Sequence, residues 1–273
     1  MIHKEFEFCL HKTNFYGQYW QPKETKAVVI LLHGMGGHSS RYAYVIEKFI
    51  ASDFAIVSYD NFGHGKTSGK RGHNPNFKAL LDVIDKVIEI SINLYPNKPI
   101  FLYGHSMGGN LVINYSLRKE NNLNGVVATS PFLKLAFQPP KWKMALGKVL
   151  QKIAPFITLK NKLNPSHVSR DLKEINKYMS DSLAHNKISP NYSLVMIETG
   201  EWAIKNAHTL NVPMFVVHGD KDKIIDHKAS VDFTENTNIA SLKLYKNGYH
   251  ELHNDLCKDI VLDDVVNWLE SKL

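Results

Sequence analysis

The sequence predicts an α/β fold in which a mostly parallel sheet carries helices on both faces. Short apolar runs such as residues 27–32 (AVVILL) have the composition of strands that are buried on both sides. Segments with helical spacing of apolar side chains, such as residues 77–94, alternate with these runs. This alternation favours parallel pairing, because each helix returns the chain to the same end of the sheet.

The N-terminal half supplies most of the expected elements. Residues 4–10 and, less cleanly, 15–21 alternate apolar and polar side chains, which is typical of an antiparallel edge hairpin. The remaining elements expected here are strands at 27–32, 54–59, 100–103 and 125–129 and helices at 42–51, 77–94 and 106–117.

The alternation stops after Pro131 and resumes near residue 208. Residues 132–207 show helical patterns interrupted by prolines and no strand. The elements expected after them are a strand at 213–217, a helix from about His227, a strand at 241–245 and a helix at 259–272. We therefore expect a core of residues 1–131 and 208–273, with residues 132–207 inserted as a helical cap over one edge of the sheet.

Composition narrows the function classes. The chain has 273 residues and a net charge of +7, but only four of its cations are arginines: Arg41, Arg71, Arg118 and Arg170. Nucleic-acid readers depend on Arg for bidentate contacts, so we expect no nucleic-acid partner. The lysines indicate a solvated surface, and a mild attraction to anionic membranes is the alternative.

The chain shows no sign of export. Cys9 and Cys257 are too few for a disulfide framework and fit no metal-ligand spacing. The first residues alternate charged and apolar side chains, unlike a signal peptide, and no apolar run approaches the ~18 residues of a membrane span. We expect a cytoplasmic protein.

The first motif with chemical meaning is Gly104-His105-Ser106-Met107-Gly108, which directly follows a predicted strand and precedes a helix. Such a sharp turn strains the serine backbone and requires tiny residues two positions before and after it. The turn lifts the hydroxyl above the sheet, over the N-terminus of the helix. We therefore predict that Ser106 is a nucleophile.

A glycine-rich loop, residues 33–38 (HGMGGH), follows the strand at 27–32. Acyl transfer builds negative charge on the carbonyl oxygen of the substrate, and backbone N–H groups commonly stabilise it. We expect the N–H groups of Met35 and Met107 to form this oxyanion hole. The alternative is a tight turn without a ligand.

A serine nucleophile needs an imidazole base and a carboxylate. Asp220 and Asp222 both follow the strand at 213–217, and His250 and His253 follow the last strand. His250 is favoured because it comes first after the strand, whereas both aspartates remain candidates. A zinc site is not expected, because the two histidines are not spaced as His-Glu-x-x-His.

Several stretches together resemble the monoacylglycerol lipase and lysophospholipase branch of the α/β-hydrolases, also called serine aminopeptidase-like hydrolases. They are residues 33–39 (HGMGGHS), 60–67 (DNFGHGKT), 104–108, 130–131, 172–181, 218–222 (HGDKD) and 249–254 (YHELHN). The resemblance implies an α/β-hydrolase fold with Ser106, Asp222 and His250 as catalytic triad, and Met35 and Met107 as oxyanion donors. One departure is Gly37, where such lipases often carry Glu.

The cap contains an amphipathic helix. Its apolar stripe consists of Trp142, Ala145, Leu146, Val149, Leu150 and Ile153, with lysines around the rest of the helix. We expect the stripe to pack over the active site. The alternative is a helix that docks on a lipid surface with its lysines toward head groups.

Taken together, these features predict a carboxylic ester hydrolase that acts on a monoacylglycerol or a similar single-chain lipid ester through an acyl-enzyme, without metal or cofactor. A lysophospholipase or a short-chain carboxylesterase is the main alternative. A peptidase, a thioesterase and a non-catalytic ligand-binding homologue are less favoured. The expected partners are a small lipid or ester substrate and, transiently, a membrane surface. The oligomeric state is left open.

Overall fold

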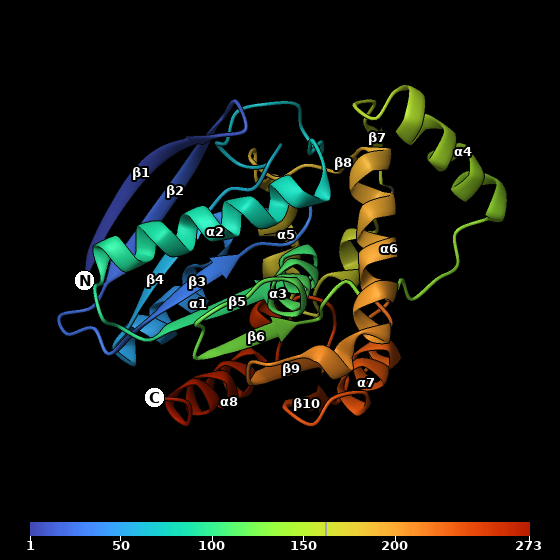
Figure 1. Cartoon of the computed structure of the whole chain (residues 1–273). Coiled ribbons are helices and arrows are strands. Elements are labelled where there is room, and N and C mark those ends of the chain that lie inside the picture. The colour runs from blue at the N-terminus through green and yellow to red at the C-terminus, as the bar shows by residue number, and fades with distance from the viewer. Residues whose placement is uncertain (162) are drawn as a thin grey trace.

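The predicted apolar runs become strands of one eight-stranded sheet in the computed structural model, which describes residues 1–161 and 163–273 (Figure 1). The strand order is β1-β2-β4-β3-β5-β6-β9-β10. The strands are β1 (Ile2–Leu10), β2 (Thr13–Gln21), β3 (Ala27–Leu32), β4 (Phe54–Tyr59), β5 (Ile100–His105), β6 (Gly125–Thr129), β9 (Met214–Gly219) and β10 (Ala240–Tyr245). The pairs β1–β2 and β2–β4 are antiparallel, and every other pair of this sheet is parallel, so the predicted mostly parallel α/β fold is confirmed.

Burial on both faces explains why the central strands are uninterrupted apolar runs. In β3 the side chains of Val28, Ile30 and Leu32 enter one hydrophobic core. Those of Ala27, Val29 and Leu31 enter a second core on the other side of the sheet. Successive side chains of a strand point to opposite faces, so a strand between two cores needs an apolar residue at every position.

Helices cover both faces, as predicted. Helices α1 (Ala43–Ala51) and α8 (Lys258–Glu270) pack on one face, and α2 (Phe77–Leu94), α3 (Met107–Arg118) and α7 (His227–Glu235) pack on the other. Side-chain caps fix several of their starts: the Asn76 side chain accepts a hydrogen bond from the Ala79 N–H at α2, and Asp226 does the same for Lys228 at α7.

Residues 132–207 are here called the cap segment. Its described residues, 132–161 and 163–207, add no strand to the main sheet. They contain α4 (Lys141–Ile153), α5 (Leu172–Ser180) and α6 (Pro190–Lys205). The expectation of no strand here was wrong, because β7 (Leu159–Lys160) and β8 (Lys187–Ile188) pair antiparallel. Two-residue strands are too short to produce an alternating pattern in the sequence.

Helix α6 attaches the cap segment to the core. The Asn110 side chain in α3 donates one hydrogen bond to the Met196 carbonyl oxygen of α6 and another to the Phe132 carbonyl oxygen at the start of the cap segment. Within the cap segment, Gly200 of α6 lies against the Leu133 backbone. A methyl group at Gly200 would come within 2.3 Å of the Leu133 carbonyl oxygen. The close approach of these backbones therefore requires glycine at this position.

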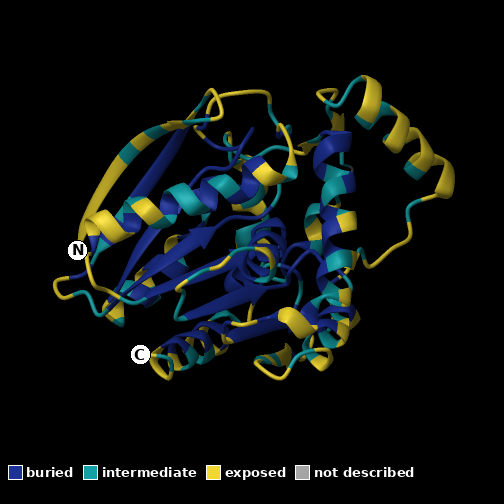
Figure 2. Ribbon diagram, viewed as in Figure 1, coloured by how far each residue is buried: buried dark blue, intermediate teal, exposed yellow. Residues whose placement is uncertain are grey.

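Helix α4, in contrast, is mostly exposed (Figure 2). Four residues of its stripe, Trp142, Leu146, Val149 and Ile153, are 64%, 48%, 53% and 71% exposed, and Leu150 is half-buried. The expected packing of this stripe over the active site is thus wrong. Helix α4 packs against α6 through a different face, where Gly147 approaches Leu194. Helical spacing defines an apolar stripe but does not say which neighbour, if any, covers it.

Among the described residues, no helix has both the length and the apolar character needed to span a membrane.

Candidate active site

Ser106 occupies the turn between β5 and α3. Its backbone has φ 54° and ψ −110°, a left-handed region that costs a non-glycine residue energy. A Cβ at Gly104 would lie 2.2 Å from the Gly108 carbonyl oxygen, and a Cβ at Gly108 would lie 2.2 Å from the Leu32 carbonyl oxygen. The strand, the turn and the two tiny residues expected around Ser106 are therefore all present.

The loops after β5, β9 and β10 bring Ser106, Asp222 and His250 together. The Ser106 hydroxyl oxygen lies 3.0 Å from His250 Nε2, and His250 Nδ1 lies 2.6 Å from Asp222 Oδ2. The three residues are only 5–7% exposed. This is the hydrogen-bond chain that activates a serine hydroxyl for attack on an acyl group.

The two competing residues lie elsewhere. The Asp220 carboxylate accepts a hydrogen bond from the Asn247 N–H at 2.6 Å and so closes the turn after β10. The His253 ring stacks on the Tyr42 ring, with centroids 4.7 Å apart. Neither residue takes part in the hydrogen-bond chain of Ser106 in the described part of the molecule.

The surroundings of Asp222 keep it ionised. Burial alone would raise the pKa of Asp222, but the charge and hydrogen bonds of His250 and His218 hold it far below its usual range. Its second oxygen accepts the Ile224 and Ile225 N–H groups at 2.8 and 3.0 Å. The carboxylate is thus fully hydrogen-bonded.

His250 is affected in the opposite direction. Burial lowers the pKa of His250, whereas the charge of Asp222 and their hydrogen bond raise it, and the net pKa lies above the ordinary value. The Asp222 charge thus favours the protonated form of this imidazole, which is the property that a general base needs.

The glycine-rich loop lies next to this serine. Its turn is closed by a hydrogen bond from the Gly37 N–H to the Gly34 carbonyl oxygen at 3.2 Å. The Met107 N–H is the first of α3 and has no partner within the helix, and the Met35 N–H has no backbone partner among the described residues. Both amides are available to bind a developing oxyanion.

Residues 246–251, which follow β10 and carry His250, are here called the histidine loop. Three further groups hold this loop, and none of them had a predicted role. The Ser130 hydroxyl donates to the His250 carbonyl oxygen at 2.8 Å. Arg41 forms a nearly buried ion pair with Glu251 at 3.0 Å. The Glu251 N–H donates to the Val168 carbonyl oxygen of the cap segment at 2.8 Å. The sequence contained one indication that Arg41 matters, because the chain has only four arginines.

His218, at the carboxyl end of β9, was also missed. Its Nε2 lies 3.1 Å from Asp222 Oδ2, and its ring is fully buried. The sequence did place a histidine at the end of the otherwise apolar run of β9. This could have indicated a role for His218, because a buried polar ring needs hydrogen-bond partners.

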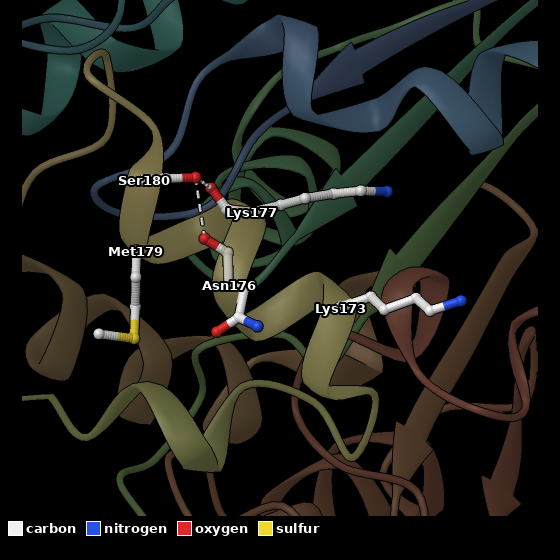
Figure 3. A pocket seen from close by; sticks show the side chains of 5 residues that line it. All are labelled: Lys173, Asn176, Lys177, Met179 and Ser180. Carbon is white, nitrogen blue, oxygen red and sulfur yellow. Dashed lines mark hydrogen bonds between the residues drawn. The ribbon is translucent and has the colours of Figure 1, made fainter.

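A separate, shallow hollow of about 730 Å³ lies on the outside of α5 (Figure 3). All of its lining residues belong to this helix: Lys173, Asn176, Lys177, Met179 and Ser180. The Ser180 hydroxyl donates back to the Asn176 and Lys177 carbonyl oxygens (Figure 3). The hollow contains no member of the hydrogen-bond chain of Ser106. Within residues 1–161 and 163–273, no cluster of three or more His, Cys, Asp or Glu side chains could hold a metal ion.

The chain is similar to known proteins in sequence and in fold. A family model described as serine aminopeptidase, S33 matches residues 23–257. An uncharacterized abhydrolase domain-containing protein of Dictyostelium discoideum is 34% identical over 93% of this chain, which spans only 27% of that longer protein. The monoacylglycerol lipase of Mycolicibacterium smegmatis is 33% identical over 93% of this chain and 92% of its own. The crystal structure of Paleococcus ferrophilus monoacylglycerol lipase, 32% identical, has a TM-score of 0.88 and covers 95% of this chain and 99% of its own.

Proposed function

Because the chain belongs to the serine aminopeptidase S33 family of α/β-hydrolases, we propose that it is a monoacylglycerol lipase, a serine hydrolase that cleaves the ester bond of single-chain lipids. Residues 1–131 and 208–273 form the catalytic core in this proposal, and residues 132–207 form a cap over the acyl-binding site.

In the first half of the reaction, Ser106 becomes acylated. His250 Nε2 accepts the hydroxyl proton as Ser106 Oγ attacks the ester carbonyl carbon, and the N–H groups of Met35 and Met107 hold the resulting oxyanion. His250 then gives that proton to the alkoxide of the leaving glycerol. Asp222 stabilises the imidazolium between these two transfers.

In the second half, water replaces the alcohol. His250 accepts a proton from the water as its oxygen attacks the acyl-enzyme, and it returns this proton to Ser106 Oγ when the ester bond to the enzyme breaks. The fatty acid leaves and the starting state is restored. Neither step needs a cofactor, because the protein supplies the base, the nucleophile and the oxyanion donors.

The observation that carries this proposal is the hydrogen-bond chain from Ser106 through His250 to Asp222, with distances of 3.0 and 2.6 Å. An alkyl fluorophosphonate should label Ser106, and Ser106→Ala should abolish both labelling and ester hydrolysis. Full esterase activity in Ser106→Ala would refute the mechanism, and an unlabelled wild-type protein would indicate a non-catalytic ligand-binding homologue.

Comparing kcat/KM over a panel of substrates identifies the leaving group that the enzyme prefers. We expect 2-acylglycerols of medium or long chain to give the highest kcat/KM, above lysophosphatidylcholine, short-chain esters and aminoacyl amides. A preference for lysophosphatidylcholine would make the protein a lysophospholipase, and a preference for short chains would make it a carboxylesterase. The same triad serves all of these reactions, so only the acyl and head-group pocket separates them.

Contact with a membrane surface is part of the proposal, together with a cytoplasmic location. The cap segment contains 12 Lys and Arg against 5 Asp and Glu, so its net charge of +7 equals that of the whole chain. The exposed apolar side chains of α4 project from the same segment. An exposed amphipathic helix with lysines beside its apolar stripe suits an anionic lipid surface.

Vesicle co-sedimentation tests this contact. Replacing two stripe residues, Leu146→Ser with Val149→Ser, should reduce the fraction bound to vesicles that contain anionic lipid. The control is Ile92→Ser on α2, since Ile92 is similarly exposed, at 49%, but lies outside the cap segment. Equal binding of the stripe variant and the wild type would exclude α4 as the contact.

A further inference from the structure

His218 lies beside the proposed triad without contacting the nucleophile. It is the fifth residue of β9, four positions before Asp222, and its ring is fully buried. His218 Nε2 lies 3.1 Å from Asp222 Oδ2, the same oxygen that His250 Nδ1 approaches at 2.6 Å. On the other side of the ring, His218 Nδ1 lies 2.8 Å from the Ser230 hydroxyl oxygen of α7.

These contacts determine where the His218 proton sits. An ionised carboxylate can only accept, so His218 Nε2 must carry a hydrogen and donate it to Asp222. Burial lowers the pKa of His218 despite the favourable charge of Asp222, which keeps the ring neutral. Its Nδ1 is then an acceptor, and the Ser230 hydroxyl donates to it. Ser230 thereby fixes the tautomer that Asp222 requires.

We propose that His218 is a positioning residue that sets the basicity of His250 by sharing the Asp222 carboxylate with it. The inference rests on the proposed function, in which His250 is the general base. Asp222 Oδ1 is already engaged by the Ile224 and Ile225 N–H groups, so His218 completes four hydrogen bonds to the carboxylate. The carboxylate is held in one orientation, and only part of its charge acts on His250.

The sign of the effect follows from this sharing. Without the His218 donor, more of the Asp222 charge falls on His250, which stabilises the imidazolium and raises the pKa of His250. Asp222 itself stays ionised, because its pKa lies far below the range in which the enzyme would be assayed. The acid limb of the pH profile, the range in which kcat/KM falls as the pH decreases, should therefore move to higher pH when the donor is lost.

Other titratable groups surround these rings. His250 faces Glu251 as well as Asp222, and the His105 ring lies 4.9 Å from it. Burial lowers the pKa of His105 and of His253, so both stay neutral near neutral pH. Burial raises the pKa of Glu251, but the Arg41 charge, helped by the two neighbouring histidines and the Asn254 hydrogen bond, lowers it on balance. His227 of α7 lies 6.3 Å from the His218 ring and needs a control of its own.

Two replacements of His218 separate the hydrogen bond from the packing. In His218→Gln the amide nitrogen stands as far along the side chain as Nε2 and can still donate to Asp222. In His218→Asn the amide nitrogen reaches only the position of Nδ1 and cannot. With a soluble short-chain ester, we expect the acid limb of His218→Asn to rise by about half to one pH unit. His218→Gln and the control His227→Gln should stay within about 0.2 unit of the wild type.

A purely structural role would lower the stability of His218→Asn and leave its acid limb at the wild-type pH, and that outcome overturns the proposal. If His218→Asn does not fold, the ¹⁵N chemical shifts of the wild-type ring decide. His218 should be neutral and protonated at Nε2 throughout the pH range of the acid limb, and an Nδ1-protonated ring would refute the proposal. A wild type without hydrolysis or labelling would instead refute the proposed function.

Discussion

Asp220 and Asp222 stand two residues apart, and their hydrogen bonds predict opposite results on substitution. Asp222 receives the His250 Nδ1 hydrogen bond, whereas Asp220 receives the hydrogen bond of the Asn247 N–H. Asp222→Asn should lower kcat by about 10³–10⁴-fold, because His250 loses both its orientation and the charge that stabilises its protonated form. Asp220→Asn should change kcat by less than about twofold. Steady-state kinetics of both variants check this, and a larger loss in Asp220→Asn would reverse the assignment.

The pKa of His250 predicts the pH dependence of the reaction. The base works only as neutral imidazole, and Asp222 raises its pKa above the ordinary value of about 6.5. Activity should therefore be complete at high pH and be lost as the pH falls through the raised pKa, on the alkaline side of about 6.5. The measurement is kcat/KM against pH, and the residual activity of Asp222→Asn should show its limb at lower pH. An acid limb well below pH 6 in the wild type would contradict the shift.

Single residues also show where sequence reasoning ends. The position of Ser106 in a strained turn was predictable because this turn needs glycines at fixed positions, and the position of His250 near it was predictable because His250 comes first after a strand. Asp222 could be preferred over Asp220 only through the family resemblance, since both follow β9. The environment of His218 was invisible, because its second partner, Ser230, lies in α7 and meets it only in the folded molecule.

At the scale of elements, the Arg41–Glu251 pair joins three segments: the turn just before α1, the histidine loop and the cap segment. The two side chains are 8% and 12% exposed, and Arg41 also lies 4.8 Å from the Tyr178 ring of α5. Arg41→Met should destabilise the protein by about 3–5 kcal/mol, because Glu251 is left buried without its counter-charge.

Urea denaturation measures this cost. The double variant Arg41→Met/Glu251→Gln should recover much of the lost stability, because a neutral amide then replaces the buried carboxylate. Lys78→Met provides the control, since the Lys78 side chain is 80% exposed in its pair with Asp82, and its unfolding midpoint should stay unchanged. If Arg41→Met matched this control, the pair would contribute nothing to stability.

The elements differ in how far the sequence determines them. Strands such as β3 and β9 were predictable because burial on both faces demands an apolar residue at nearly every position. The strands β7 and β8 were not, since two residues carry no period. The stripe of α4 was recognised, but its exposure was not, because exposure depends on where α6 supports the helix.

At the scale of the whole molecule, charge and chemistry are divided between two parts of the chain. The sheet brings the ends of β5, β9 and β10 to one edge, where Ser106, Asp222 and His250 meet. The cap segment carries a net charge equal to the +7 of the entire chain, so the rest of the protein is neutral overall. Attraction to an anionic surface should therefore orient the molecule with its cap segment toward that surface.

This division predicts a salt dependence that only membrane-bound substrate reveals. Salt screens charges over a Debye length of about 30 Å at 0.01 M and about 8 Å at 0.15 M. Hydrolysis of monoacylglycerol in anionic vesicles should fall several-fold between these concentrations, because the attraction of the cap segment weakens. A soluble short-chain ester should be hydrolysed at the same rate under both conditions, since the triad is buried and neither substrate nor core carries net charge.

Neutral vesicles provide the second control. A parallel loss on the soluble ester would place the salt effect in the active site, and equal rates on anionic vesicles would show that the cap charge does not guide the enzyme to its substrate.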